Sequence, residues 1–297
     1  MTIRVGYLGK TSAPEFAALR TRANITLAVL CDPEQDRTEQ VAGETGAAPY
    51  DSPDALVAGA DIDAVIIGLP APRQAGLTVQ AAERGVHTLI VPPLARGYDE
   101  GKQALETVER CGIITSVGWP MRYAINLVQI RHHVRRGGAQ WVLGRLVTGA
   151  ATGEELLSRA AGVCDLVRYV AGPVSGVEHS SCSDGGSFHG RLRLDSGAVA
   201  HVLATSGAKV PAAEEASIEV LTAGNRMAWY YGTNHTVVNG TEQRVAEKPD
   251  GLYVAEIAAF LTSIETGWRS PILCDYADGV ETLAMIAALR QALEEAR

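Results

Sequence analysis

The feature that most constrains this chain is an alternation, over its first 120 residues, of short apolar β-branched runs with longer segments of helical periodicity. Strands are expected at 3–8, 25–31, 64–68, 88–91 and 113–117, with helices at 15–22, 35–45, 74–84 and 99–111 between them. Each strand–helix unit takes about 25 residues, and strands joined through helices pair in parallel. We therefore predict a doubly wound parallel α/β sheet of the Rossmann type, whose ligand lies beyond the carboxyl ends of the strands.

The pattern changes after Arg122. Five expected strands follow with turn signals between them, at 143–148, 188–194, 198–205, 217–221 and 226–231, and two helices close the chain at 254–265 and 277–295. Strands joined by short turns pair in antiparallel fashion. We predict two domains: a dinucleotide-binding domain over 1–122, and an α+β domain with a large, mostly antiparallel sheet over 123–297.

Charge and cysteine content exclude several classes of protein. The formal net charge of −8 argues against nucleic acid or an anionic membrane as partner and leaves small metabolites. No apolar run reaches the ~18–20 residues of a membrane span, and the first residues enter a strand without a signal peptide, so a cytoplasmic location is expected. The five cysteines are widely spaced and form no CxxC, which predicts neither disulfides nor a metal site.

The segment after the first strand reads Gly9-Lys10-Thr11-Ser12-Ala13-Pro14, where a dinucleotide fold normally has GxGxxG. Of the three glycines only Gly9 is present, in the position of the tight turn. The hydroxyl and backbone groups of Thr11 and Ser12 are the expected replacements as phosphate donors.

The second strand ends at Asp32, about 23 residues after Gly9, where an acidic side chain accepts hydrogen bonds from the adenosine ribose. This favours NAD over NADP, because a carboxylate repels a 2′-phosphate. Aspartate is also a frequent N-cap, and a cap on the helix after Pro33 is an equally weighted interpretation.

The order of several short motifs resembles that of the glucose–fructose oxidoreductase, inositol dehydrogenase and MocA (Gfo/Idh/MocA) family along nearly the whole chain. The motifs are Asp32-Pro33, Tyr50-Asp51-Ser52, 62–67 leading to Pro70, 85–90, Pro93-Leu94-Ala95, Met121-Arg122-Tyr123 and 165–169 through Gly172-Pro173. The resemblance implies hydride transfer between NAD(P) and a sugar, cyclitol or similar carbonyl compound. It also implies oligomers built through the sheet of the second domain.

Three departures from the family pattern coincide with its catalytic groups. A lysine beside the nicotinamide is expected from the resemblance, and Pro92 stands there; the four lysines are Lys10, Lys102, Lys209 and Lys248. An aspartate and a histidine four residues later are expected on a helix of the second domain, and these positions are Ser158 and Gly162. Proton transfer needs titratable groups, so the usual alcohol dehydrogenase chemistry is not expected.

Other residues are candidates for the missing roles. Tyr123 is a candidate proton donor and Arg122 a candidate anion clamp, although a packing aromatic and an ion-pair partner are the commoner roles of such residues. The resemblance places Pro70 and Gln74 beside the cofactor, and Gln74 can donate a hydrogen bond but not shuttle protons. The basic run 131–136 with its adjacent histidines fits a solvated helix face better than a metal site.

We predict an NAD(P)-binding oxidoreductase-like protein with atypical chemistry, such as reduction of an imine or a conjugated C=C bond in a small metabolite. NAD is the expected cofactor. The alternatives are a catalytically inactive paralogue that serves as a regulatory or partner subunit, with or without a cofactor, and a redox-neutral cyclase or lyase that reuses the cleft. A homo-oligomer through the second domain is expected, with a hetero-oligomer as the alternative.

Overall fold

The computed structural model describes residues 2–183, 186–207, 215–244 and 249–296, so Lys209 and Lys248 lie outside the described residues. The chain forms two compact units. The first comprises Met1–Pro120 and Asp250–Val280, and the second comprises Met121–Pro249 and Glu281–Arg297. The first boundary is two residues from the expected one. The return of 250–280 to the first unit differs from the expected division.

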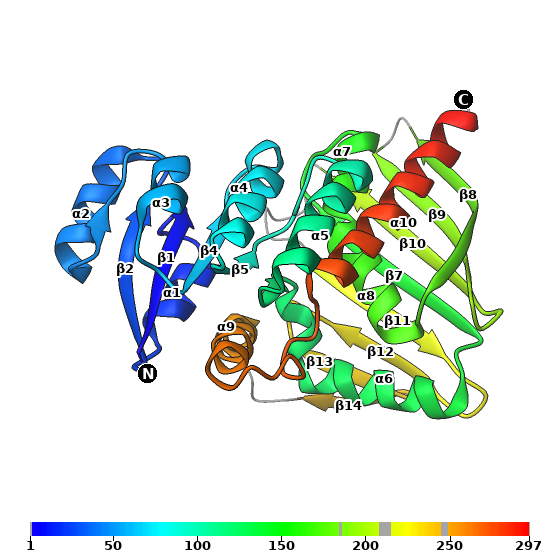
Figure 1. Cartoon of the computed structure of the whole chain (residues 1–297). Helices are drawn as coiled ribbons and strands as arrows, with labels where there is room; N and C mark the ends of the chain where they lie inside the picture. Colours follow the sequence, from blue (N-terminus) through cyan, green and yellow to red (C-terminus); the bar gives the residue numbers. More distant parts are fainter. Residues whose placement is uncertain (1, 184–185, 208–214, 245–248, 297) are drawn as a thin grey trace. The chain divides into compact units, whose positions relative to one another are not determined.

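The first unit is built on a six-stranded sheet in the order β3-β2-β1-β4-β5-β6. Its strands are β1 (Ile3–Gly9), β2 (Ile25–Cys31), β3 (Ala48–Pro49), β4 (Ala64–Gly68), β5 (His87–Ile90) and β6 (Thr115–Val117), and every pairing is parallel. This is the strand order of a dinucleotide-binding Rossmann sheet, with its switch point between β1 and β4. The predicted Rossmann fold is confirmed (Figure 1).

Helices cover this sheet because its strands carry apolar side chains on both faces. Those of the first segment are α1 (Pro14–Arg20), α2 (Gln35–Thr45), α3 (Pro53–Gly59), α4 (Ala71–Glu83) and α5 (Tyr98–Cys111). One apolar layer joins β1 and β4 to α1 and α2, and a second joins β2 and β4 to α3 and α4. Tyr7 of β1 contacts Phe16 of α1 in the first layer, with ring centroids 4.8 Å apart.

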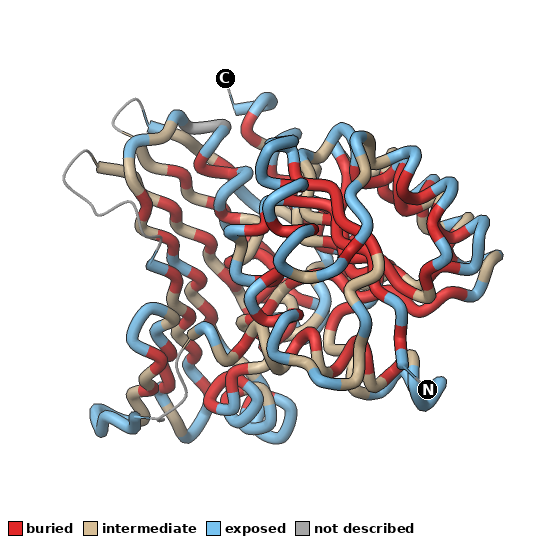
Figure 2. The backbone as a smooth tube through the Cα atoms, turned by 90° about the vertical axis from the view of Figure 1, so that its left-hand side faces the viewer, coloured by how far each residue is buried: buried red, intermediate tan, exposed pale blue. Residues whose placement is uncertain are grey.

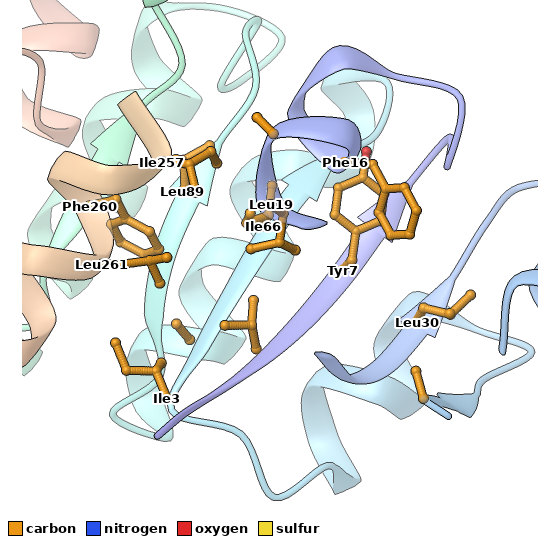
Figure 3. Packing of buried hydrophobic residues seen from close by; sticks show 14 of the residues in the cluster. Ile3, Tyr7, Phe16, Leu19, Leu30, Ile66, Leu89, Ile257, Phe260 and Leu261 are labelled. Carbon is orange, nitrogen blue, oxygen red and sulfur yellow. The ribbon is translucent and has the colours of Figure 1, made fainter. Parts of the chain in front are cut away.

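The helix α9 (Pro249–Thr266) explains why the later segment joins the first unit. Its buried Ile257, Phe260 and Leu261 belong to the same apolar cluster as Tyr7 and Phe16, as Figure 3 shows. Burying a Leu, Ile or Phe side chain contributes about 1.5–3 kcal/mol, so three such residues determine where the helix packs. The Arg269 side chain adds hydrogen bonds to two carbonyl groups, at 112 and 113.

The second unit is built on an eight-stranded sheet in the order β14-β13-β12-β11-β7-β10-β9-β8. Its strands are β7 (Trp141–Thr148), β8 (Val174–Ser183), β9 (Ser187–Leu194), β10 (Val199–Ser206), β11 (Glu215–Leu221), β12 (Arg226–Tyr230), β13 (His235–Val238) and β14 (Thr241–Arg244). Only the β7–β10 pairing among them is parallel in the described part of the chain. The predicted α+β character is confirmed.

The helices of this unit are α6 (Ile125–Gly137), α7 (Gly153–Arg159), α8 (Ala161–Ala171) and the part of α10 (Tyr276–Glu295) that begins at Glu281. Val202 is the register partner of both Gly144 and Gly190, so these three positions share one face of the sheet. A Cβ atom at Gly144 would meet Val163 of α8, and one at Gly190 would meet Leu289 of α10. Figure 2 shows the resulting alternation of buried and more exposed residues along the strands.

No helix in the described ranges combines the length and apolarity that a membrane crossing requires. The same part of the chain contains no group of three or more His, Cys, Asp or Glu side chains arranged to hold a metal ion.

Candidate functional site

A cavity of about 620 Å³ opens at the carboxyl ends of β1, β2, β4 and β5 in the first unit. Its wall includes the first residues beyond these strands, among them Lys10, Asp32, Leu69 and Val91. The volume lies in the range of small-molecule and cofactor sites, and the position is the switch point where a doubly wound sheet binds its ligand. This cavity is the candidate site.

Gly9 sets the close approach of β1 and β4 beside the cavity. Its φ is +154°, and a Cβ atom there would lie 2.8 Å from the carbonyl oxygen of Gly68. Residues other than glycine adopt such a backbone conformation only with strain. The close packing of β1 against β4 therefore explains why a glycine stands at position 9, whether or not a ligand binds.

Asp32 lies in the cavity wall with 6% of its surface exposed. Its Oδ2 accepts hydrogen bonds from the backbone N–H of Thr11 (2.6 Å) and from the Thr11 hydroxyl (2.9 Å), and its Oδ1 accepts one from the N–H of Glu34 (3.0 Å). A carboxylate has about four acceptor positions, so Oδ1 retains one for a ligand hydroxyl. The residue predicted to hold the ribose faces the cavity with that capacity.

Two expectations for the loop after β1 are corrected. Thr11 does not present its donors to a phosphate, because both its N–H and its hydroxyl are directed to Asp32. Ser12 is exposed and is not part of the cavity wall. Glu34 occupies the N-cap position of α2, so the capping interpretation of Asp32 is also replaced: its side chain supports the N–H of that residue instead.

The two residues expected after β4 have different places. Pro70 lies in the cavity wall and is the N-cap residue of α4. Gln74 is fully buried behind the wall, where its Nε2 donates to the carbonyl oxygen of Val91. Gln74 thus holds a residue of the wall in place and has no surface for direct contact with a ligand.

Sequence reasoning did not assign four charged residues of the wall to the site: Lys10, Glu15, Asp51 and Arg73. Arg73 pairs with Asp54, which leaves Lys10 as the cation of the wall without a described ion pair. Lys10 directly follows Gly9 and is the first of only four lysines, a signal that could have identified it. Its ammonium group suits a phosphate.

Glu15, the second residue of α1, brings a buried carboxyl group to the cavity, with 8% of its surface exposed. Burial raises its pKa, and a hydrogen bond from its own backbone N–H opposes that shift in part. The pKa of Tyr7 is raised as well, by burial first and then by the charges of Glu15 and Asp32. The Tyr7 hydroxyl donates to the Lys10 carbonyl oxygen at 3.0 Å.

These residues fit a dinucleotide. Asp32 has an acceptor for a ribose hydroxyl, Lys10 offers a cation for the pyrophosphate, and Gly9 keeps the strand ends close at the switch point. Bound NAD(H) would accept or supply a hydride. The protein's own contribution would be to bind and orient it against the apolar residues of the wall, such as Leu69 and Val91.

Arg122, expected as an anion clamp, is corrected to a structural residue of the second unit. It is 2% exposed and forms a bidentate ion pair with Asp165, with Nε–Oδ2 and Nη2–Oδ1 distances of 2.8 and 2.6 Å. The Thr282 hydroxyl also donates to Asp165 and accepts from Arg168. A guanidinium committed to a buried carboxylate is not free to clamp a substrate.

The remaining positions of interest are separated between the two units. Pro92 follows Val91 of the cavity wall, so the place of the family's lysine adjoins the cavity without a donor. Tyr123 ends a short 3-10 turn, Pro120–Tyr123, and is partly exposed. Ser158 lies on α7 and Gly162 on α8, and the two helices are interrupted at Ala160. The expected pair of positions therefore does not share one continuous helix.

Residues 3–119 match the model of the Gfo/Idh/MocA oxidoreductase family, described as an NAD-binding Rossmann fold. The match covers the first domain, which is therefore similar to the NAD-binding domain of that family. The scyllo-inositol 2-dehydrogenase (NAD(+)) of Bacillus subtilis is 36% identical over 93 residues, which are 31% of this chain and 27% of that enzyme. The matched segments span from 27% to 42% of the curated relatives' lengths. NAD is the cofactor that the matching family model implies for this domain.

Solved structures extend the similarity to the whole fold. The UDP-N-acetylglucosamine 3-dehydrogenase of Acidithiobacillus ferrooxidans has a TM-score of 0.84 at 20% identity, over 99% of each chain. A biliverdin reductase from Synechocystis, solved with biliverdin and NADP+, has a TM-score of 0.82 at 18% identity, over 99% of this chain and all of that one. At these identities the similarity shows the fold alone.

Proposed function

We propose that the protein is an NAD(H)-dependent oxidoreductase that reduces an imine or a conjugated C=C bond of a small metabolite. The observation that carries the proposal is a cavity with Asp32 and Lys10 in its wall, next to a position, Pro92, that offers no proton donor. The cofactor half of a family site is kept, and the family's proton-transfer residues are replaced.

The chemistry follows from that difference. Reduction of a ketone places charge on oxygen and needs a proton there as the hydride arrives, which is the work of a positioned acid. An iminium carbon already carries the positive charge that hydride neutralises, and a conjugated C=C bond spreads the new charge over its acceptor. Both need less help from a titratable side chain. A biliverdin reductase among the structural neighbours supports the inclusion of conjugated acceptors in the test.

The test begins with calorimetric binding of NADH and NADPH to the purified chain. Turnover is then followed with a cyclic imine, a conjugated enone, a ketone and, with NAD+, a cyclitol. Deuterium on the reactive carbon of NADH should appear on carbon in the product of an imine or enone. Absence of binding of either cofactor would overturn the proposal, and so would cyclitol oxidation as fast as imine or enone reduction.

Two outcomes would favour the other functions. Tight NADH binding without turnover of any substrate class indicates a partner or regulatory subunit. Product formed without consumption of NADH indicates a redox-neutral enzyme. Either replaces the proposed reaction while leaving the cofactor site intact.

We also propose that the second unit pairs with a second copy of this chain through the face of its sheet opposite α8 and α10. That face carries apolar and aromatic side chains, namely Trp141, Leu143, Val199, Leu203 and Tyr230. Its charges are largely paired, as in the Arg191–Glu178 and Arg226–Glu219 contacts of 3.1 and 2.6 Å, although the whole chain carries −8. Two copies would therefore meet here with little repulsion.

The size of the face suits such a contact. Eight strands of this length span on the order of 800 Å², which is what each partner contributes to a standard interface. Light scattering should show a dimer for the wild type and a monomer for Leu143→Glu/Leu203→Glu. Trp268→Ser, at an exposed tryptophan of the first unit, should leave the dimer intact. A monomeric wild type at high concentration would overturn the proposal in favour of a different partner.

A further inference from the structure

The cavity wall contains more acidic than basic groups, although a dinucleotide brings two negative phosphate charges. Its carboxyl groups are those of Glu15, Asp32 and Asp51, and its cations are those of Lys10 and Arg73. Arg73 is paired with Asp54. One lysine therefore faces the pyrophosphate and an excess of protein carboxylates.

The three carboxyl groups differ in what holds their charge. Asp32 accepts three hydrogen bonds from the protein. Asp51 is exposed and accepts from Gln35 Nε2 at 3.4 Å. Glu15 is buried, and among the described residues its own backbone N–H is the group that opposes the desolvation that raises its pKa. It is the carboxyl group whose charge is least supported.

We infer that binding of NAD(H) is coupled to uptake of a proton by Glu15. The charged and titratable groups that share the cavity wall with it are Tyr7 on β1, Lys10 in the following loop, Asp32 and Asp51 beyond β2 and β3, and Arg73 on α4. Arg20 is also on α1, and Glu256 is buried on α9, whose apolar residues pack in the same cluster as Phe16. Arg20 lies over the Phe16 ring and Arg73 is paired with Asp54, so both cations already have partners. A proton on Glu15 is then the direct way to reduce the repulsion between its carboxylate and the phosphates.

The consequence is a binding constant that depends on pH. If one proton enters with the ligand, NADH affinity falls by up to about tenfold for each pH unit above the pKa of Glu15 in the free protein. Glu15→Gln carries no charge at any pH. It should bind NADH more tightly than wild type at pH values above that pKa, with an affinity that is nearly flat with pH.

The inference rests on dinucleotide binding at this cavity, and calorimetry tests the two separately. NADH is titrated into wild type, Glu15→Gln and Glu39→Gln between about pH 5.5 and pH 8.5, in buffers that differ in ionisation enthalpy. Glu39 is exposed on α2 and outside the wall, so its variant makes the same change in net charge without touching the cavity. The buffers count protons taken up by the wild type even where a variant folds poorly.

We expect proton uptake in wild type and Glu39→Gln, its loss in Glu15→Gln, and the same pattern with ADP-ribose, which carries the pyrophosphate without the nicotinamide. NADH binding without proton uptake in wild type overturns the inference, as does uptake that persists in Glu15→Gln. No binding to any of the three proteins overturns dinucleotide binding itself.

Discussion

The two units each contain a low-exposure aspartate that organises its surroundings, and the two differ in what remains available. Asp32 of the first unit accepts three hydrogen bonds and keeps an acceptor position towards a cavity. Asp165 of the second unit receives both arms of Arg122 and the hydroxyl of Thr282 with 1% of its surface exposed. A polar network that leaves one position open can bind a ligand, and a closed one can only hold the fold.

The largest expected effect comes from removing the carboxylate of Asp165 from its buried network with Arg122 and Thr282. Asp165→Ala leaves Arg122 buried without its carboxylate, which should lower the free energy of unfolding by about 3–5 kcal/mol, measured by urea denaturation. The double variant Arg122→Met/Asp165→Leu removes both charges and should recover most of that loss. Glu242→Gln, which breaks the exposed Arg244–Glu242 pair, is the control and should change little.

Measuring NADH binding by the Asp165→Ala variant then tests whether Asp165 has a role beyond stabilising the fold. Asp165→Ala should bind NADH as wild type does at temperatures where it is folded, because its network lies in the second unit. A specific loss of NADH affinity in the folded variant would contradict the comparison.

The next largest effect is expected from Gly9, which sets the close approach of β1 and β4 beside the network of Asp32. Gly9→Ala must accept a φ of +154° and a contact of 2.8 Å with the Gly68 carbonyl oxygen. The expected cost is on the order of 2–4 kcal/mol in unfolding free energy. Gly43→Ala is the matched control, because it lies within α2 and its new methyl group would have nothing within 4 Å, so it should stabilise slightly. Equal effects of the two substitutions would argue against strain at Gly9.

Removing the Asp32 carboxylate should lower the free energy of unfolding less than the Asp165 and Gly9 substitutions do, and should weaken NADH binding more. Asp32→Ala frees three donors, two of them from Thr11, and should cost about 1–3 kcal/mol of unfolding free energy. It also removes the acceptor for the ribose, so NADH affinity should fall by about tenfold or more, measured by calorimetry. Asp36→Asn, exposed on α2, is the control. Unchanged affinity in folded Asp32→Ala would show that the open acceptor position is not used.

The surroundings of Asp32 could be predicted in part from the sequence, and the buried network of Asp165 could not. Gly9, Asp32 and Pro70 stand at strand ends, and the order of parallel strands brings such ends together, so their neighbourhood follows from periodicity. The link from Thr11 to Asp32 does not follow, because it depends on the path of a loop that has lost its glycines. Glu15 was hidden for the same reason.

Contacts between residues far apart in the sequence could not be predicted from the sequence. Arg122 and Asp165 are 43 positions apart, and the motifs that contain them carry no sign that the two side chains pair. The helix α9 was predicted as a helix, but its apolar residues carry no information on which sheet they will cover. Periodicity identifies an element and its buried face; the partner of that face is decided by packing.

The smallest expected effect concerns two histidines on the outer face of the second sheet. His189 Nε2 and His201 Nδ1 are 2.9 Å apart, with ring planes within 5° and centroids 5.2 Å apart, so one ring donates an N–H to the other. The pKa of each is lowered, first by burial, and then by His179 and Arg191 for His189 and by His189 and Arg191 for His201. Protonation of both rings would leave two donors facing each other.

The sign of the pH dependence follows from proton counting. Between the ordinary pKa of about 6.5 and the lowered value in the folded chain, the unfolded chain binds more protons, so stability falls as pH drops through this window and levels off below it. His201→Gln should flatten that part of the curve in urea denaturation at fixed protein concentration. Trp141→Phe, which alters a ring neighbour of His201 without removing a titratable group, should keep it. His87, whose pKa burial also lowers, is common to both variants, so their difference isolates the pair; identical slopes would contradict the assignment.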